Sequence, residues 1–455
     1  MSCRILRIVI ASLALLLVLL APEHSAAGWK AGAARHVITP ESPLWLSGYA
    51  ARKRPSEGTR HELWVKALAL EDAEGNRGVI VTTDLLGFSP SLYEELAADF
   101  ERECGLRREQ VMLTASHTHT GPALADALPD FQPRDPKQRE AIDVYTKRLR
   151  GLIVKTVSES LANMQPATVW AGDGTADFAV NRRENVEKDV VQIRREGKLR
   201  GPVDHDVPVL AVKKPTGELV AIVFGYACHA TTLNDYLWSG DYPGFAQLAL
   251  EKAHPELRQA MFFQGCGADQ NPLPRRSVEL CQEYGERLAD AVEQVLARPM
   301  RPLDPSLAMQ FASINLPFDP PSHEEFAKLA AEGRNKRWAR RILELLDSGE
   351  TLPTEAMLPV QVWRLGDEQL WIALGGEVVV DYALRFKEQY GSRTWVAGFT
   401  NAVPAYIPSD RVWREGGYES GAFFSYGLPT ERWSPGIEQR IAEAVEELVA
   451  KTGSE

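Results

Sequence analysis

Pairs of apolar runs joined by short polar turns recur along this sequence, and they constrain its fold more than any other feature. The stretches VKALALEDAEGNRGVIVTTD, VPVLAVKKPTGELVAIVFGYACH and LPVQVWRLGDEQLWIALGGE each contain two such runs. Each stretch predicts a β-hairpin with a polar turn. The second run of each is almost continuously apolar, which is typical of a strand buried on both faces. These strands end at Asp84, His229 and Glu377, and the apolar run before His117 predicts a fourth buried strand.

Helical spacing fills the segments between the hairpins. A helix is expected to begin after Ser89, with Pro90 in its first turn, and to close at Gly105. Similar spacing predicts helices over residues 141–161, 277–296, 322–346 and 434–450. Strands that alternate with helices indicate the α/β class, and the hairpins indicate mixed β-sheets flanked by helices. We interpret residues 28–455 as a single large domain, with residues 320–353 as a surface insertion.

Composition and the first residues bear on partners and location. The 455 residues carry a net charge of −11 without a block of lysine or arginine, so no nucleic-acid partner is expected. Residues 1–27 begin with basic residues, continue as an apolar run and end in small residues, which predicts a signal peptide and export to the periplasm or beyond. An uncleaved membrane anchor is the alternative, but the apolar run is short for a span of about 20 residues. No later segment is apolar enough to cross a membrane.

Four cysteines follow the predicted signal peptide: Cys104, Cys228, Cys266 and Cys281. An even number permits two disulfides in an exported protein, while burial as free thiols suits a chain of this length equally well. The cysteines form no CxxC pair, so a structural zinc knuckle is not expected.

Potential metal ligands follow the predicted buried strands. In an α/β sheet, ligands collect where strands end and loops begin, and His117, His119, His229 and Glu377 all lie at such ends, as does Asp84. On an extended segment residues i and i+2 point to the same side, so His117 and His119 are expected to reach one site. Two histidines and a carboxylate suit a zinc ion that keeps one position for water. Taken singly, each histidine also fits a structural role in a loop or in the core.

The motifs around these residues resemble those of the neutral/alkaline (non-lysosomal) ceramidases. TASHTHTGP is similar to the family's His-Thr-His-Ser-Gly-Pro motif, CHATTLN with SGDYPG to HGTSMN with SGDNKG, and GGEVVVDYALR to GEFTTMSGRR. LSGYA, VNRRE and NAVPAYIPS resemble further segments of the family in the same order. The resemblance extends over most of the chain after residue 27 and implies a ceramidase-like catalytic domain.

The resemblance implies a role for each matching residue. It implies four zinc ligands: His117, His229, Glu377 and Tyr406. His119 is implied to contact the substrate, Arg182 to hold its polar head, and Gly48 to meet it through the backbone. The implied reaction is zinc-dependent hydrolysis of an N-acyl amide by metal-activated water, with zinc and His119 stabilising the oxyanion.

The sequence departs from the family pattern in two places. Where the family has GDVSPN with a serine, this chain has GADQNP, so Gln270 occupies the serine position and can donate a hydrogen bond but cannot attack. Asp269 and Asn271 are expected to be acid/base or orienting groups, or parts of an Asx turn. Cys266 would act as a nucleophile only with a lowered pKa. The ceramidases also carry a C-terminal β-sandwich domain, and we interpret this sequence, which ends at Glu455, as lacking it.

Three functions remain open from the sequence. The first is an exported zinc amidase that acts on N-acylated lipids, with a role in lipid metabolism. The second is a zinc hydrolase for a different bond or substrate, such as an ester or a carbohydrate-linked amide. The third is a non-catalytic, metal-containing binding protein. A small-molecule or lipid substrate is expected for the two enzymes, and a lipid substrate would allow peripheral membrane contact, although no basic amphipathic helix argues for it.

Overall fold

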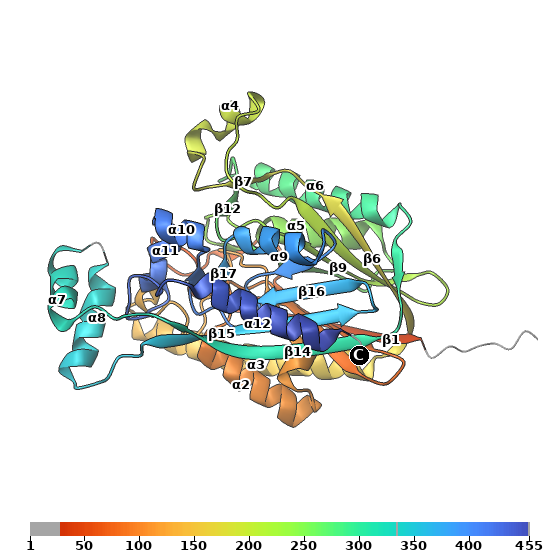
Figure 1. Ribbon diagram of the computed structural model, residues 1–455, viewed down its shortest axis with the longest axis horizontal. Helices are drawn as coiled ribbons and strands as arrows, with labels where there is room; N and C mark the ends of the chain where they lie inside the picture. Colours follow the sequence, from red (N-terminus) through yellow and green to blue (C-terminus); the bar gives the residue numbers. More distant parts are fainter. Residues whose placement is uncertain (1–27, 334, 454–455) are drawn as a thin grey trace, which may run out of the picture.

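Two β-sheets packed face to face form the centre of the protein in this computed structural model, which describes residues 28–333 and 335–453. Helices cover the outer face of each sheet, so the molecule has four layers (Figure 1). This arrangement confirms the predicted α/β class with mixed sheets flanked by helices. The predicted signal peptide, residues 1–27, lies outside the described residues.

The strands and helices follow one another along the whole described chain. The strands are β1 Trp29–Val37, β2 Gly58–Thr59, β3 Trp64–Glu71, β4 Arg77–Thr83, β5 Val111–Ala115, β6 Gln165–Thr175, β7 Ala179–Asn181, β8 Asp206–Lys213, β9 Leu219–Tyr226, β10 Leu237–Trp238, β11 Gln259–Gln264, β12 Gln270–Pro272, β13 Arg301–Leu303, β14 Leu307–Pro317, β15 Glu355–Leu365, β16 Gln369–Leu374, β17 Glu377–Val378, β18 Trp395–Ala397 and β19 Tyr406–Ile407. The helices are α2 Pro90–Asp99, α3 Pro136–Ala162, α4 Val190–Arg195, α5 Asp241–Ala253, α6 Val278–Leu296, α7 His323–Glu332, α8 Lys336–Asp347, α9 Asp381–Tyr390, α10 Asp410–Glu415, α11 Tyr418–Gly421 and α12 Ile437–Thr452.

The three predicted hairpins form the framework of both sheets. The larger sheet has the order β11-β9-β8-β6-β1-β3-β4-β5, with β13 beside β6, and the smaller one has the order β14-β15-β16-β18. The pairs β3–β4, β8–β9 and β15–β16 are antiparallel, as predicted. The strands β5 and β11 pair in parallel with β4 and β9. These parallel pairs place the carboxyl end of β5 beside that of β4, and the carboxyl end of β11 beside that of β9. The ends of β5 and β11 both contact residues 397–400, through the bridges Thr114–Thr400 and Gly265–Ala397.

Successive side chains along each strand point to opposite faces of the sheet, so each strand contributes to two different cores. One face of the larger sheet, with residues such as Leu68 and Val223, packs against Trp363 and Trp371 of the smaller sheet. The opposite face packs partly against α2 and α3 and partly against α5 and α6. The outer face of the smaller sheet packs against α9 and α12. Both faces of the central strands are therefore dry, which explains their continuous apolar runs.

Helix ends follow local sequence signals at some positions and depart from them at others. Ser89 caps α2 as predicted, and Gly105 closes the π-helical turn that follows, with φ 65°. The helix predicted over 322–346 is instead two helices, because Gly333 ends α7 in an extended conformation and α8 begins at Lys336. The last helix begins at Ile437 rather than after Ser434.

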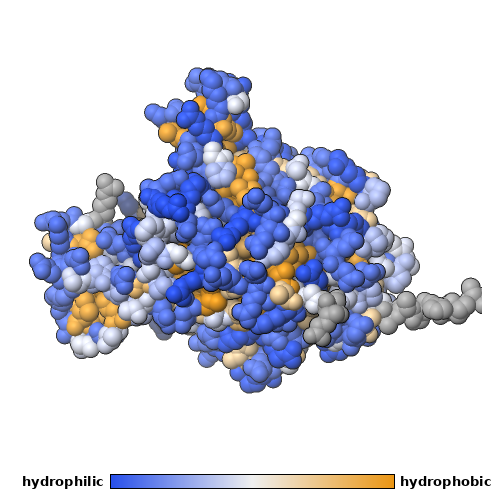
Figure 2. All heavy atoms as spheres, in the orientation of Figure 1, coloured by the Kyte–Doolittle hydropathy of each residue, from blue (hydrophilic) through white to orange (hydrophobic). Residues whose placement is uncertain are grey.

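The segment predicted as a surface insertion, residues 320–353, projects from the layers as an arm formed by α7 and α8 (Figure 1). The arm has a small core of its own around Phe326, Trp338 and Ile342. Figure 2 shows a largely hydrophilic face with apolar residues gathered on this arm. Within the described residues, no helix has the length and apolar character needed to cross a bilayer.

Candidate metal centre

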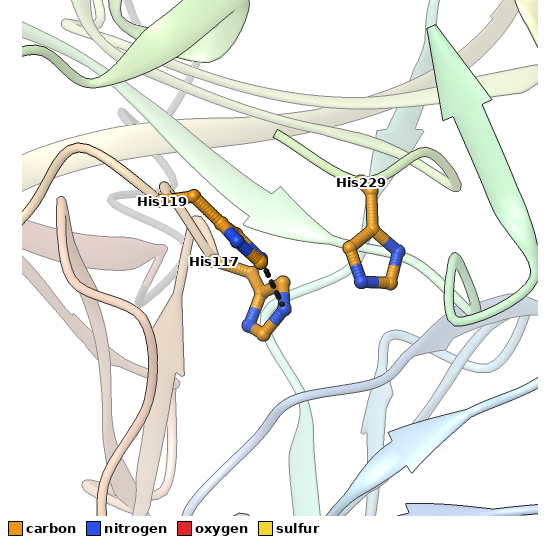
Figure 3. Close-up of side chains that lie close together, drawn as sticks. All are labelled: His117, His119 and His229. Atoms are coloured by element: carbon orange, nitrogen blue, oxygen red, sulfur yellow. Dashed lines mark hydrogen bonds between the residues drawn. The ribbon is translucent and has the colours of Figure 1, made fainter. Parts of the chain in front are cut away.

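Three segments that follow buried strands bring ligand-type side chains to one buried point. His117 follows β5, His229 follows β9, and Glu377 opens β17 directly after β16. Their side chains are buried, with 1%, 0% and 3% residual exposure. In Figure 3 the rings of His117, His119 and His229 face a common space. The structure therefore brings together residues that are separated by up to 260 positions in the sequence.

Backbone carbonyl groups orient the two deeper histidines. The Nδ1 of His117 lies 2.6 Å from the Leu86 carbonyl oxygen, and the Nδ1 of His229 lies 2.7 Å from that of Gly267. A carbonyl oxygen only accepts, so each Nδ1 carries the proton and each Nε2 has a free lone pair. A histidine that binds a metal is oriented in the same way in most proteins.

The free donor atoms are spaced as metal ligands are. The Oε2 atom of Glu377 lies 3.1 Å from His229 Nε2 and 3.5 Å from His117 Nε2. The Nε2 of His119 lies 3.2 Å from His117 Nε2. Ligands at the usual zinc distances form a tetrahedron with edges of roughly 3.3 Å. The donor set of imidazole nitrogens and one carboxylate therefore fits zinc in both chemistry and spacing.

Two of these donor atoms have no hydrogen-bond partner within the described residues. Both His229 Nε2 and Glu377 Oε2 are buried and unpaired. Buried polar groups of this kind cost free energy unless they have a partner, and a bound cation would satisfy both atoms.

Burial also sets the protonation states of the candidate ligands. It lowers the pKa of His117 to about 4 and lowers that of His229, so both rings are neutral at neutral pH. Burial acts to raise the pKa of the Glu377 carboxyl group. The electrostatic attraction of His117 and His229, together with a hydrogen bond from the Tyr426 hydroxyl, outweighs this effect and holds the pKa at about 2.

The backbone conformation that brings both histidines of the His-x-His pair to the site differs from the one expected from the sequence. Strand β5 ends at Ala115, so the pair does not lie on an extended segment. His117 instead has φ 58°, a left-handed conformation that is uncommon for a residue other than glycine. The expectation that both rings meet one site is confirmed, but the reason is a turn at His117 rather than strand alternation. Strained residues of this kind cluster at functional sites.

His119 lies between the buried ligands and the solvent. Together with His117 and His229 it forms a group whose ligand atoms all lie within 4.8 Å of one another. Its Nδ1 is buried and has no hydrogen-bond partner in the part of the chain that the structure describes, and its ring borders an open cleft. Gly48, at φ 87°, packs directly against this ring, because a Cβ there would lie 2.5 Å from His119 Cγ. His119 is thus close enough to act either as a third imidazole ligand or as the group that meets a substrate.

Tyr406 and Arg182 lie on the cleft side of the site. Tyr406 is paired with Glu377 in the short β17–β19 ladder, and its hydroxyl oxygen accepts from Arg182 Nη2 at 3.4 Å. Arg182 also donates through Nε to Glu419 at 2.8 Å and through Nη1 to Asn271 at 3.3 Å. The implied role of Tyr406 as a metal ligand stays a prediction, and Arg182 is fixed by Glu419, which the sequence did not single out.

Two kinds of residue occur in the loop GADQNP, residues 267–272, where the sequence departs from the family pattern. Asn271 lines the cleft, whereas Asp269 and Gln270 are fully buried beneath it. The Asp269 carboxylate accepts from the Val380 backbone N–H at 2.9 Å, and the Gln270 amide donates to the Ala227 carbonyl oxygen at 2.7 Å. The Gln270 backbone carbonyl accepts from the His229 N–H at 2.9 Å. Asp269 and Gln270 therefore support the site rather than face it.

Other sequence candidates lie away from the reacting region. Asp84 is buried and accepts hydrogen bonds from Trp64 and Gln247, so it is not one of the converging ligands. Burial raises the pKa of Cys266 well above its usual value, so this thiol is not a thiolate at neutral pH. The four cysteines in the described part of the chain are free thiols, so neither of the two disulfides permitted by the count is formed.

Tyr426 is a site residue that the sequence did not indicate. Its hydroxyl donates to Oε1 of Glu377, which leaves Oε2 directed toward the two histidines. It lies in the segment GAFFSYG, which has no helical or strand periodicity and no metal-ligand spacing. Only its position in the folded chain reveals the role, because the partner is 49 residues away.

The four-layer fold and the buried histidine–carboxylate cluster together define an α/β protein with a candidate metal centre at the ends of buried strands. The family model of neutral/alkaline non-lysosomal ceramidases, N-terminal part, matches residues 29–271. The chain belongs to this family. Glu377 and Tyr406 lie beyond the matched residues, so their place in the site depends on the structure.

Individual relatives agree with this assignment. The chain is 24% identical over 224 residues to neutral ceramidase A of Dictyostelium discoideum, covering 48% of this chain and 30% of that protein. It is 26% identical over 243 residues to the neutral ceramidase of Pseudomonas aeruginosa, covering 51% of this chain and 35% of that protein. The aligned region therefore spans about a third of each of these relatives.

Solved structures of ceramidases share the fold. The crystal structure of the Pseudomonas aeruginosa neutral ceramidase superposes with a TM-score of 0.70 at 20% identity, covering 94% of this chain and 75% of that one. A ceramidase described as complexed with C2 gives the same TM-score at 19% identity and covers 94% of this chain. The likeness extends over nearly the whole chain, including the half that the family model does not match.

Proposed function

We propose that this protein is an exported, zinc-dependent hydrolase that cleaves an amide bond. The observation that carries the proposal is the convergence of His117 Nε2, His229 Nε2 and Glu377 Oε2 at a buried point beside an open cleft. The names of the relatives, neutral ceramidases, support an N-acyl amide as the bond. The predicted signal peptide supports export.

The geometry gives each residue a distinct task. His117, His229 and Glu377 would hold the metal, with Tyr406 as the fourth candidate ligand. When bound, zinc supplies a Lewis acid and lowers the pKa of a water molecule. Burial holds the pKa of His119 well below its usual value, so this imidazole is neutral and can hydrogen-bond the substrate at the cleft floor.

Arg182 is placed to orient a polar group of the substrate. Its guanidinium is fixed by Glu419 and Asn271 and lies on the same side of the cleft as Tyr406. A donor fixed before the substrate arrives does not have to reorganise during the reaction. Tyr426 acts indirectly, by holding the Glu377 carboxylate in its orientation.

Metal content and turnover together test the proposal. We expect about one zinc per chain in the purified protein, and we expect N-acyl amide hydrolysis that a chelator abolishes and zinc restores. His117→Ala should lose the metal and the activity. His254→Ala is the matched control, since His254 bonds Glu293 outside the site and should change neither.

The outcomes separate the alternative functions. Zinc that binds stoichiometrically without hydrolysis of any amide or ester would indicate a metal-containing binding protein. Hydrolysis of esters but not of amides would replace the proposed bond. Wild-type protein that contains no metal, or Glu377→Ala protein that keeps full turnover, would remove the mechanism altogether.

A further inference from the structure

An open cleft lies above His119 and His229, beside the candidate metal centre. It has a volume of about 640 Å³ and is bordered by His119, His229 and Tyr406. Among the described residues that line it, Val186 and Leu273 are the only aliphatic side chains, while arginine, glutamate, tyrosine and asparagine dominate. Long alkyl chains would find little apolar surface in this cleft to replace contact with water.

A separate apolar cavity lies beside two residues that orient the candidate ligands. Leu86, whose carbonyl orients His117, and Tyr426, which bonds Glu377, both line it, together with Phe88, Leu128 and Val403. Its volume is about 40 Å³, which is room for roughly three water-sized probes. A short acyl group is therefore the largest apolar group that this cavity suits.

Four arginines line the cleft, and carboxylates bind three of them. Arg182 and Arg183 share the buried Glu419. Arg275 binds Glu187 through two of its nitrogens, at 3.0 and 2.7 Å. Arg276 is different: within the residues that the structure describes, no carboxylate lies within salt-bridge distance of it.

The protein holds the exposed Arg276 side chain in place, and Glu187 acts on it only from beyond salt-bridge distance. Its Nη1 donates to the Tyr49 hydroxyl oxygen at 2.8 Å, and the Tyr49 O–H donates onward to the Leu233 carbonyl. The backbone at Arg276 has φ 88°, in the left-handed region that glycine favours, and its N–H bonds the Thr232 carbonyl oxygen at 2.8 Å. A side chain held in this way is pre-organised for a ligand.

Tyr49 links Arg276 to the reacting region. The Arg276 guanidinium carbon lies 5.2 Å from the Tyr49 ring centre, which lies 4.8 Å from the His119 ring centre. The two distances together place the guanidinium within about 10 Å of the His119 ring. An extended substrate of six or seven bonds can span that distance.

We propose that Arg276 is a subsite for an oxyanion on the substrate, so that the preferred substrate is a short-chain N-acyl amide bearing a carboxylate, phosphate or sulfate. An arginine is suited to this role because its planar guanidinium binds oxyanions with paired hydrogen bonds. This proposal rests on the proposed amide hydrolysis only for the identity of the bond, since the subsite itself is a binding site.

Binding of matched probes to the zinc-loaded protein tests the subsite. We expect calorimetry to show that N-acetyl-6-aminohexanoate binds at least about tenfold more tightly than the neutral N-acetyl-6-aminohexanol. N-acetyl-6-aminohexyl phosphate, used as a third probe, shows whether carboxylate or phosphate is preferred. Arg276→Gln should abolish the preference for the charged probes, and Arg276→Lys should retain part of it.

A control variant separates the subsite from net charge. Arg148→Gln removes one positive charge from α3, outside the cleft lining, and should leave the preference intact. Equal binding of the charged and neutral probes to the wild type, or no binding of either, would overturn the proposal. So would a preference that survives in Arg276→Gln.

Turnover of the same probes distinguishes this proposal from the proposed function. A tenfold preference in binding without any cleavage leaves the oxyanion subsite standing and counts against the amidase. Cleavage at equal KM for the charged and neutral probes leaves the amidase standing and removes the subsite. A preference that resides in KM rather than in kcat is the result expected if both are correct.

Discussion

The position of the His119 ring depends on the absence of a side chain at residue 48. A Cβ on Gly48 would lie 2.5 Å from both Cγ and Nδ1 of His119, closer than carbon and nitrogen atoms approach. The ring would have to move, and with it the Nε2 that lies 3.2 Å from His117 Nε2. The family resemblance implies that Gly48 meets the substrate, whereas the geometry gives it a second task, the placement of His119.

Gly48→Ala should therefore lower kcat by at least about tenfold while zinc content stays near one per chain, since misplaced catalytic groups are costly. Gly75→Ala is a matched control: Gly75 has φ +88°, close to the +87° of Gly48, but nothing lies within 4 Å of its Cβ position. Both substitutions should cost roughly 1–2 kcal/mol of stability from the left-handed backbone. Equal activities of the two variants, measured with the same amide substrate, would show that His119 tolerates the displacement.

At the scale of elements, the α7–α8 arm fastens the loop that carries Tyr426. Arg341 of α8 binds Asp130 at 2.9 Å and donates to the Gly427 carbonyl oxygen at 2.9 Å. Trp338 donates to the Leu428 carbonyl oxygen at 2.8 Å. Because Tyr426 precedes these residues and donates to Glu377, the arm is mechanically connected to a predicted metal ligand. The surface insertion is thus part of the support of the site.

Arg341→Met should loosen this loop, because it removes the bond to Gly427 and leaves the buried Asp130 unpaired. We expect faster hydrogen exchange in residues 422–428 and zinc affinity that falls by roughly tenfold, as for other supporting contacts of metal ligands. Arg340→Met, at the neighbouring exposed position, is the control and should change neither quantity. Unaltered exchange in Arg341→Met, measured by mass spectrometry, would mean that Trp338 and packing hold the loop alone.

At the scale of the whole molecule, Asp269 joins parts of the chain that are far apart in sequence. Its carboxylate binds the Val380 N–H at 2.9 Å and the Asn181 side-chain amide at 3.2 Å, and its carbonyl accepts from the Arg182 N–H at 2.8 Å. Burial raises the pKa of this carboxyl group to about 7. In the unfolded chain the pKa returns to about 3.9.

The folded protein thus binds one more proton than the unfolded chain between pH 4 and pH 7. Its stability should fall as the pH rises through this window, by at most about 4 kcal/mol from this group, and then level off above pH 7. The amide of Asp269→Asn does not ionise. The free energy of unfolding of the wild type minus that of the variant therefore reports the pH dependence that comes from the Asp269 carboxyl group. Thermal unfolding of both proteins between pH 4.5 and 8.5 measures the difference. A difference that is constant or that rises with pH would show that Asp269 is ionised throughout.

Local sequence patterns sufficed for much of the fold. The hairpins, the buried strand before His117 and the cap at Ser89 were predictable because alternation, apolar runs and capping are properties of neighbouring residues. The division of residues 322–346 into two helices and the start of α12 at Ile437 were not, because helical spacing continues across both boundaries while the backbone at Gly333 and Gly436 interrupts it.

The sequence by itself placed His117, His229 and Glu377 at the ends of buried strands, and this was enough to predict a shared metal site. Only the tertiary structure decided how they meet: the left-handed turn at His117, the carbonyl partners of both Nδ1 atoms, and the hydroxyl of Tyr426 on Glu377. It likewise decided that Arg276 faces the cleft with no carboxylate of the described residues within salt-bridge distance. These features depend on distances between residues far apart in the chain, and side-chain spacing along a strand or helix carries no information about such distances.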